Sequence, residues 1–390
     1  MTLQRKLALV AALYFVEGFP MGVFVDVWPV FLRDSGASLE TIGWLSLLGL
    51  AWTLKALWAP AVDGIGLWRH WISGALAGMA LCLALAPALA GHPAAAGVIA
   101  LFALASATQD IAIDASAVAL TRPGEEAQLS STRVAMYRVG KLGFGAGGLI
   151  LADRIGWIAL HEALAVVVAL LALLALAAPR LQAAGPRARG EWRRGLALLL
   201  RPGVAGAGAF LVFYRLGDLA MAPMVGVFWR DTGASLALIG LVPSGVSAGM
   251  GILGAALGGV LVARAALGRA LFVGGVLATV SNLGYAAAAL SGAPLWAVVS
   301  ASLAESLCGG IASVALVSLL VLACDRAHAG VQFALLTALS PLAGRLIGGA
   351  SGEVVAAFGY AAWFAATGAL TLPALAFIPA VRRWADPRRA

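Results

Sequence analysis

Apolar residues occur in long runs along the whole chain, and polar residues gather in the short stretches between them. Each run holds about twenty residues, which is enough for a helix to cross a hydrocarbon core of ~30 Å. The alternation of apolar and polar positions that is typical of barrel strands is absent. The pattern therefore predicts an all-α integral membrane protein.

The apolar runs predict twelve transmembrane helices. They cover residues 7–31, 41–61, 71–90, 95–120, 132–152, 157–178, 204–230, 237–262, 268–290, 294–323, 330–350 and 355–380. The longest stretch between two spans, 179–203, is rich in Arg, Pro and Gly and lies at the midpoint of the chain. We therefore expect two six-helix bundles, 1–178 and 204–390, joined by a basic cytoplasmic linker over 179–203.

Basic residues predict the orientation of these spans. With the N-terminus inside, eighteen Lys and Arg, Arg133 among them, lie on that side, and only Arg33, Arg154 and Arg230 lie outside. Because basic loops stay in the cytoplasm, both termini are predicted to be cytoplasmic. The net charge of +8 then follows from topology. It favours contact with anionic membrane lipid over nucleic acid, since the linker has almost no aromatic residues.

One phrase is written twice, as FLRDSGASLETIG at 31–43 and as FWRDTGASLALIG at 228–240. The correspondence extends to Gly140-Lys141-Leu142 and Gly344-Arg345-Leu346, and it places Gln109 opposite Glu305. Six spans in each half make the two repeats parallel, related by a pseudo-twofold axis along the membrane normal. This arrangement resembles the major facilitator superfamily fold, in which two similar bundles rock around a central site.

Charged residues also lie inside the predicted spans, at Glu17, Asp26, Lys55, Asp110, Asp114, Arg138, Lys141, Arg215, Asp218, Glu305 and Arg345. If they faced lipid, they would together cost on the order of 25–35 kcal/mol. We therefore expect them to line a water-filled cavity or to pair with one another. Asp110 and Asp114 are four residues apart and share one helix face, and the spacing of Arg215 and Asp218 also puts them on one face.

These residues supply the candidate chemistry. Carboxylates in a low-dielectric cavity can load and release protons, so the proton-coupling candidates are Glu17, Asp110, Asp114, Asp218 and Glu305. Basic and polar groups can hold an anionic solute, so the substrate-binding candidates are Lys55, Arg138, Lys141, Arg215, Arg345, Gln109 and Tyr137. The gating candidates near the inner ends of the spans are Asp63, Arg69, Arg264 and Arg269. For Arg215 and Asp218, a purely structural pair is an equal alternative.

Nothing in the sequence indicates catalysis. The histidines form no helical metal pair, and no phosphate-binding loop or nucleophile elbow is recognisable. We expect neither an enzyme nor a cofactor or metal, and we expect protons and a small-molecule solute as partners of a monomer.

Several segments carry a family resemblance: LYFVEGFPMG at 13–22, LKALWAPAVD at 54–63, TQDIAIDA at 108–115, YRVGKLGFGAGG at 137–148 and QFALLTALSPLAGRLIGG at 332–349. They resemble the AmpG-like permeases and their acetyl-CoA transporter relatives. The resemblance implies proton-linked import of a bulky polar solute across the inner membrane, which for AmpG is an anhydro-muropeptide.

Two features depart from the AmpG pattern. The compact length resembles the RhtX and FptX siderophore permeases, and Gly64 follows Asp63 where the family commonly has a basic residue. Muropeptide import and ferric-siderophore import therefore both stay open, and a drug or metabolite exporter of the same fold is the third alternative.

Overall fold

The chain is almost entirely helical. The computed structural model describes residues 1–122, 124–177, 203–324 and 329–385, and these residues contain helices, turns and no β-strand. All twelve predicted spans fall on helical segments of the described residues, and eight helices among them are long and apolar enough to cross a membrane. The predicted all-α membrane fold is confirmed.

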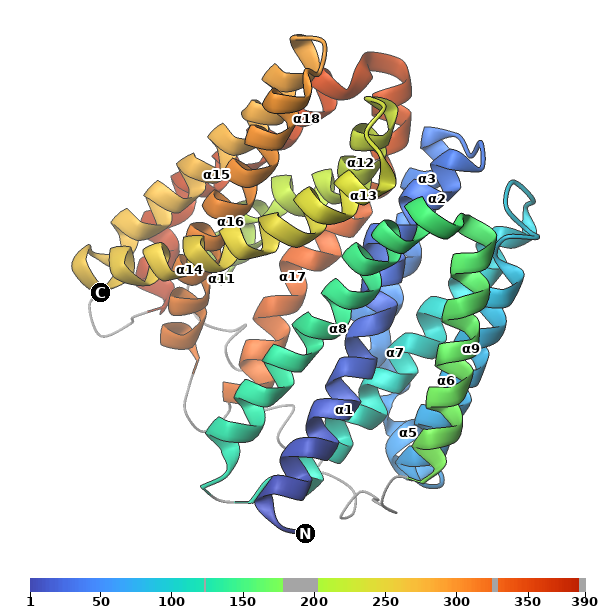
Figure 1. Cartoon of the computed structure of the whole chain (residues 1–390). Helices are drawn as coiled ribbons and strands as arrows, with labels where there is room; N and C mark the ends of the chain where they lie inside the picture. The colour runs from blue at the N-terminus through green and yellow to red at the C-terminus, as the bar shows by residue number, and fades with distance from the viewer. Residues whose placement is uncertain (123, 178–202, 325–328, 386–390) are drawn as a thin grey trace. The chain divides into compact units, whose positions relative to one another are not determined.

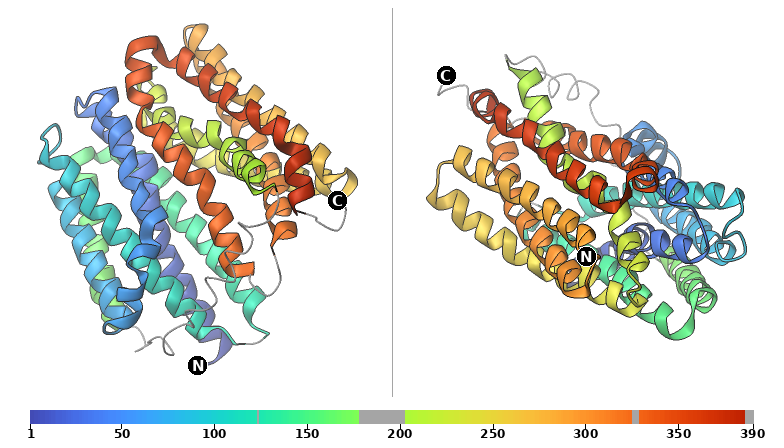
Figure 2. Two further views of the ribbon diagram at one scale, coloured as in Figure 1. Left: turned by 180° about the vertical axis from the view of Figure 1, so that it is seen from behind. Right: turned by 90° about the horizontal axis from the view of Figure 1, so that it is seen from above.

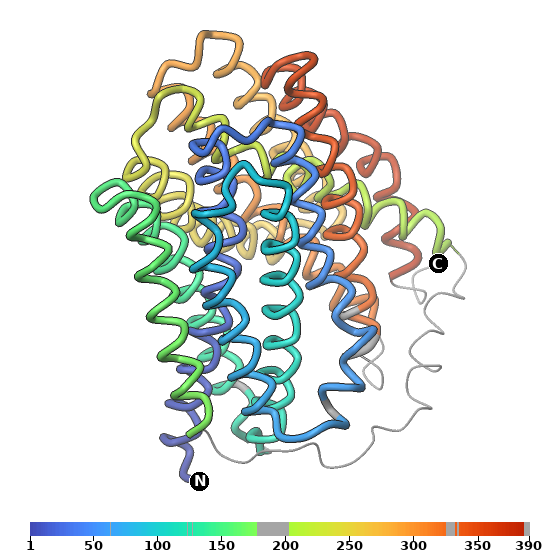
Figure 3. The backbone as a smooth tube through the Cα atoms, turned by 90° about the vertical axis from the view of Figure 1, so that its right-hand side faces the viewer, coloured from blue at the N-terminus to red at the C-terminus, as the bar shows by residue number. Residues whose placement is uncertain are grey.

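The first six spans are built from these elements: α1 (Leu3–Gly22), η1 (Val23–Val27), α2 (Trp28–Asp34), α3 (Leu39–Ser46), η2 (Leu47–Gly49), α4 (Leu50–Leu54), η3 (Lys55–Leu57), α5 (Ala59–Gly64), α6 (Trp68–Leu85), α7 (Ala94–Leu120), α8 (Glu126–Ile155) and α9 (Trp157–Leu176). The second span is the most broken of them. Pro60 sits in the first turn of α5, where a missing N–H is tolerated, so the chain restarts a helix there. In contrast, α7 runs as one continuous helix (Figure 3).

The last six spans are built from α11 (Val204–Tyr214), α12 (Leu216–Asp231), α13 (Leu236–Ile239), η5 (Gly240–Val246), α14 (Ser247–Arg264), α15 (Leu267–Leu290), α16 (Leu295–Ala323), α17 (Ala329–Gly349) and α18 (Ser351–Ala385). The helix pair α11 and α12 is interrupted at Arg215, whose φ of −115° and ψ of 6° are not helical. The predicted linker over 179–203 lies, except for Gly203, outside the described residues.

Contacts within the chain define two compact units, which differ from the predicted halves in two short segments. Unit 1 comprises residues 1–38, 48–177 and 234–244, and unit 2 comprises residues 39–47, 203–233 and the described residues from 245 onward. The start of the second span thus packs in unit 2, and the start of the eighth span packs in unit 1.

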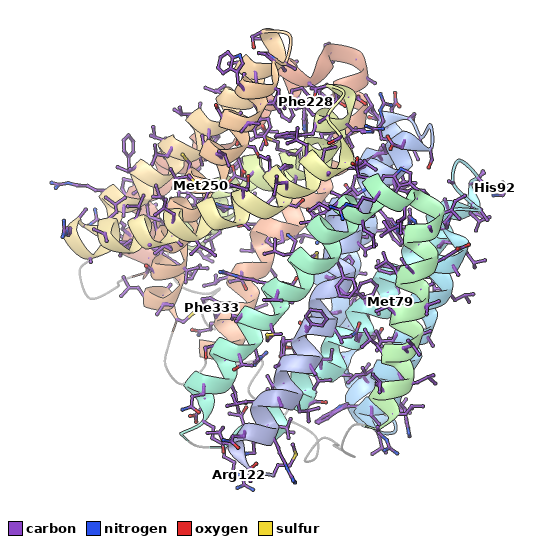
Figure 4. All side chains as sticks on the ribbon, viewed as in Figure 1. Met79, His92, Arg122, Phe228, Met250 and Phe333 are labelled. Atoms are coloured by element: carbon purple, nitrogen blue, oxygen red, sulfur yellow. The ribbon has the colours of Figure 1, made fainter. Side chains whose placement is uncertain are left out.

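Glycines allow close helix packing in unit 1. Helices α1 and α8 lie side by side (Figure 1), and a Cβ at Gly22 would lie 2.7 Å from the backbone nitrogen of Gly145. Small residues are favoured at such contacts because they bring two backbones together. Helix α6 packs against α7 and α9, with Met79 fully buried (Figure 4).

Unit 2 has its own apolar core. Helix α15 packs against α16 and α18 (Figure 2). Helix α14 packs closely on α16, where a Cβ at Gly254 would collide with the carbonyl of Leu307 and a Cβ at Gly258 would lie 2.9 Å from the carbonyl of Ile311. Phe210 and Tyr214 lie at the centre of the core and are fully buried.

The first part of the repeated phrase makes the same contact in both units. In unit 1, Phe31 packs 4.5 Å from the His161 ring, and Asp34 accepts a hydrogen bond of 3.0 Å from Trp157 Nε1. In unit 2, Phe228 (Figure 4) packs 5.0 Å from the Tyr360 ring, and Asp231 accepts a hydrogen bond of 2.7 Å from Tyr360. The phrase therefore ties the first helix of each half to its sixth.

The second part of the phrase explains why residues 39–47 belong to unit 2 and residues 234–244 belong to unit 1. A Cβ at Gly43 would lie 2.7 Å from the carbonyl oxygen of Gly349 in unit 2, and a Cβ at Gly240 would lie 2.5 Å from that of Ala146 in unit 1. No side chain fits at either place. Each glycine thus lets the second helix of one half pack tightly against the fifth helix of the other half.

Candidate functional site: a buried cluster of charges

Five charged side chains of unit 1 gather at one place inside the helices. They come from four predicted spans: Glu17 on α1, Lys55 on η3, Asp110 and Asp114 on α7, and Arg133 on α8. The i, i+4 spacing of the two aspartates brings both to the face of α7 that Lys55 approaches. Because Lys55 is the first residue of η3, the break in the second span positions the ammonium group.

Asp114 is the most fully paired acid of this cluster. Its Oδ1 accepts hydrogen bonds from Arg133 Nη2 at 2.8 Å and from the Tyr14 hydroxyl at 2.7 Å. Its Oδ2 lies 3.4 Å from Lys55 Nζ. The Arg133 guanidinium also lies over the Tyr14 ring, 4.7 Å from its centroid, which adds a cation–π contact. Charge-assisted hydrogen bonds from three donors hold this carboxylate in place.

Asp110 is deeper and less completely paired. Lys55 Nζ lies 3.6 Å from its Oδ2, while its Oδ1 is buried and accepts no hydrogen bond from the described residues. Glu17 Oε2 and both amide atoms of Gln109 are likewise buried and unpartnered among the described residues. The side chain of Asp110 is 11% exposed, against 40% for Asp114. The cluster therefore extends from a dry end at Gln109 to an open end at Asp114.

We expect the open end to face water, because a charged group exposed to lipid within a span would be costly. With all five groups ionised, three carboxylates face two cations, and the cluster carries one excess negative charge. A proton on Asp110 or Glu17 would neutralise it. Lys55 is shared by Asp110 and Asp114, so protonation of Asp110 would leave the lysine with Asp114 alone. Protonation of Asp110 would therefore decide whether Lys55 pairs with both aspartates or with Asp114 alone.

Two tryptophans hold the broken second span against α7. Trp52 Nε1 donates to Ser106 at 3.1 Å, and Trp58 Nε1 donates to Thr108 at 3.1 Å. They lie on either side of Lys55 in the sequence. These hydrogen bonds keep the irregular segment, and with it the ammonium group, in a defined position.

The other predicted candidates of unit 1 lie outside this cluster. Arg138 is exposed on α8, and Lys141 lies near Asp26 on η1. Tyr137 is half-buried on α8, where its carbonyl meets the backbone at Gly18. Arg69 donates to the carbonyl of Leu176 at 3.1 Å. The side chain of Asp63 is not among the described ones.

Unit 2 contains a second, smaller set of charged candidates. Arg215, at the break between α11 and α12, lies 3.2 Å from Asp218 Oδ2 and donates to the carbonyl of Gly309 at 2.8 Å. Glu305 on α16 accepts a hydrogen bond of 3.2 Å from Ser306 and lies close enough to Asp218 and Arg215 to interact with both electrostatically. Arg215 and Asp218 do form the predicted pair.

Three further predicted residues lie on other helices of unit 2. Arg345 is half-buried on α17, and Arg264 and Arg269 are exposed at the end of α14 and the start of α15. Their predicted roles in substrate binding and gating stay predictions.

The sequence interpretation missed one member of the unit 1 cluster, Arg133, and the neighbouring Tyr14, which donates to Asp114. Arg133 was assigned to the cytoplasmic loops because it lies at the edge of a predicted span, and Tyr14 carries no charge that would attract notice. The contact between Tyr14 and Asp114 joins residues one hundred positions apart, and no local pattern predicts it.

A separate ion pair connects the start of α1 to the turn before α8. Lys6 Nζ lies 2.6 Å from Glu125 Oε2, and the Lys6 side chain is 4% exposed. Glu125 also accepts from the backbone N–H of Arg122 at 3.1 Å. The hydrogen bond from Lys6 is the main reason that the pKa of Glu125 lies below its ordinary value of 4.5.

This pair predicts a pH dependence of stability. A lowered pKa means that the stabilisation is complete above pH 4.5 and is lost as the pH falls through the lower folded-state pKa. We expect Glu125→Gln to melt at a lower temperature than the parent at neutral pH, and the difference to shrink below pH 4.5. Glu126→Gln is the matched control, because the Glu126 carboxylate accepts from the Gly124 N–H instead. Melting curves in detergent measure both, and a difference that is independent of pH would contradict the assignment.

Comparison with known proteins agrees with this description. The family model of acetyl-coenzyme A transporter 1 matches residues 6–85. The anhydromuropeptide permease of Escherichia coli (strain K12) is 29% identical over 398 residues, covering 97% of this chain and 80% of the relative. The solved structure of the nucleoside transporter NupG superposes with a TM-score of 0.74 at 16% identity, covering 97% and 99% of the two chains. That of a D-xylose-proton symporter gives 0.73 at 14% identity, covering 97% of each.

The chain is a multi-pass membrane protein with the major facilitator fold of the solved transporter structures, and the relative that it resembles over nearly its whole length is a permease. The family match over residues 6–85 and the relative at 29% identity show that the chain is similar to acetyl-coenzyme A transporter 1 and to an anhydromuropeptide permease. The family resemblance seen in the sequence is thereby confirmed.

Proposed function

We propose that this permease imports a bulky, anionic solute of the anhydro-muropeptide type across the inner membrane, together with protons. The observation that carries the proposal is the unit 1 cluster, in which Lys55 is shared by Asp110 and Asp114 and one carboxylate is in excess. A buried acid that can exchange a proton for a cationic partner is the element that proton coupling needs. The similarity to an anhydromuropeptide permease supports the choice of solute.

The cycle that we propose begins with the open end of the cluster in contact with water. Protonation at Asp110 weakens its hold on Lys55, and the lysine and Arg133 can then contribute positive charge to the carboxylates of a solute. Release of the proton on the other side restores the Lys55–Asp110 contact and expels the solute. The basic residues predict that both termini are cytoplasmic, and import would then run toward the side with the basic loops.

Uptake into proteoliposomes tests this proposal. The purified chain is reconstituted, an outward-acid pH gradient is imposed, and labelled anhydro-muropeptide is compared with a panel of ferric siderophores. We expect anhydro-muropeptide to accumulate and a protonophore to abolish the accumulation. Uptake of a ferric siderophore alone would show that the solute is a siderophore and not an anhydro-muropeptide. Uptake that does not depend on the gradient would contradict proton coupling. Uptake of neither solute would contradict the import proposal.

A further inference from the structure

Unit 2 buries polar groups that the unit 1 mechanism does not use. Asp218 lies in the first turn of α12, directly after the helix break at Arg215, and it is 8% exposed. Discontinuous helices are common at the ion sites of transporters, because a helix end offers unpaired backbone groups there. The Asp218 carboxylate thus lies beside a helix break of the kind that forms binding sites in other transport folds.

Neutral polar side chains converge on the same place. Asn282 on α15 neighbours Asp218, and Asn282 and Thr371 on α18 are both completely buried. A Cβ at Gly217 would lie 2.8 Å from Thr371 Oγ1 and 2.9 Å from Asn282 Nδ2, so both side chains meet the start of α12. Asn282 lies close enough to Asp218 for a side-chain hydrogen bond, and the Thr371 hydroxyl makes none to another described residue. A buried polar group without a partner calls for an explanation, such as a bound water, ion or proton.

The charges of this set do not balance. A Cβ at Gly309 would lie 3.5 Å from Arg215 Nη1 and 3.7 Å from Glu305 Oε1, so the guanidinium and the second carboxylate approach the same turn of α16. Two carboxylates, Asp218 and Glu305, therefore lie near one guanidinium, which forms an ion pair with Asp218.

The other titratable groups near the set do not change this balance. They are Tyr214, Tyr285 and Cys308, and a phenol or a thiol is neutral at pH 7. Fully ionised, the set holds one excess negative charge, and a buried charge without a partner is strongly unfavourable.

We propose that unit 2 contains a second proton-binding site, formed by Glu305 and Asp218 around Arg215, and that two protons accompany each solute. The inference rests on the proposed function and adds its stoichiometry. The proton binds to a carboxylate oxygen when the site faces the acidic side and leaves as a free proton on the other side, so no co-reactant is needed. Unit 1 carries the first proton in its own cluster, which also has one carboxylate in excess.

A proton fits this site better than a metal ion does. The Arg215 guanidinium lies 3.2 Å from Asp218, and a metal cation bound to that carboxylate would be repelled by it. No group of three or more His, Cys, Asp or Glu side chains suited to a metal occurs in the part of the chain that the structure describes. Sodium is a common coupling ion in transporters, and the experiment has to distinguish it from a proton.

The test is the accumulation ratio of solute at equilibrium in proteoliposomes with the membrane potential clamped at zero. One pH unit corresponds to 1.36 kcal/mol for each coupled proton, so the ratio rises about tenfold per pH unit with one proton and about a hundredfold with two. We expect the hundredfold dependence for the parent chain and the tenfold dependence for Glu305→Gln, which leaves the Arg215–Asp218 pair intact. Glu305→Asp, which keeps a carboxylate, is expected to retain the hundredfold dependence.

Glu162→Gln, an exposed position on α9, is the matched control and should behave as the parent does. A tenfold dependence in the parent overturns the second site and leaves the proposed function standing, and this outcome does not depend on whether any variant folds. An unchanged hundredfold dependence in Glu305→Gln overturns the assignment to Glu305. Accumulation that follows a sodium gradient and is lost in Glu305→Gln overturns the assignment of a proton as the ion bound in unit 2. No accumulation with any pH gradient contradicts the proposed function itself.

Discussion

Replacing Asp110 with asparagine is expected to abolish proton-driven accumulation of solute while leaving the protein folded. The amide cannot ionise, so Lys55 stays with Asp114 permanently and the exchange of partners stops. Asp110 Oδ1 accepts no hydrogen bond from the described residues, and a neutral isostere therefore removes only the charge attraction to Lys55 across 3.6 Å. The parent should accumulate solute at least about tenfold per pH unit, and Asp110→Asn should show no dependence on the gradient.

The contrast with Glu305→Gln follows from the arrangement of the cations. Lys55 is shared between two acids, whereas Arg215 is anchored to Asp218 and to the Gly309 carbonyl. Neutralising Asp110 thus freezes a shared cation, and neutralising Glu305 removes only one proton. Exchange of labelled solute without a gradient is the companion measurement, and size-exclusion profiles report folding. Accumulation by Asp110→Asn at the parental rate would show that another acid couples the proton.

Replacing Gly254 with valine is expected to destabilise unit 2 strongly. A Cβ at this position would collide with the backbone carbonyl of Leu307, and backbone cannot move aside as a side chain can. Helices α14 and α16 would have to separate along their shared face. Overpacking costs typically 1–3 kcal/mol and occasionally more, and we expect about 3 kcal/mol or a complete loss of monodisperse protein.

Gly259→Val is the matched control on the same helix. A Cβ at Gly259 meets no atom within 4 Å, so this variant carries the same change in helix propensity without the collision. Melting temperature in detergent and recovery after size exclusion measure both variants. Equal behaviour of the two would show that the α14–α16 contact is looser than the glycine geometry indicates.

The candidate site was predictable only in part. The expense of burying charge singled out Glu17, Lys55, Asp110 and Asp114, and the i, i+4 spacing placed both aspartates on one face of α7. The same reasoning also selected Arg138, which is exposed, and Lys141, which lies near Asp26. The hydropathy pattern reveals that a charged residue lies within a span, but it does not reveal which way the side chain points. The direction of its side chain depends on how the helix is rotated against its neighbours.

The amino-acid sequence by itself determined the all-α membrane fold, the twelve helical spans and the duplication, because long apolar runs and a repeated phrase are local properties that need no partner to be recognised. Only the tertiary structure decided that Arg133 and Tyr14 complete the Asp114 site and that Arg215 donates to the Gly309 carbonyl. It also decided that Gly43 packs closely against α17 and Gly240 against α8. These contacts join residues far apart in the chain, and they follow from how helices pack and rotate.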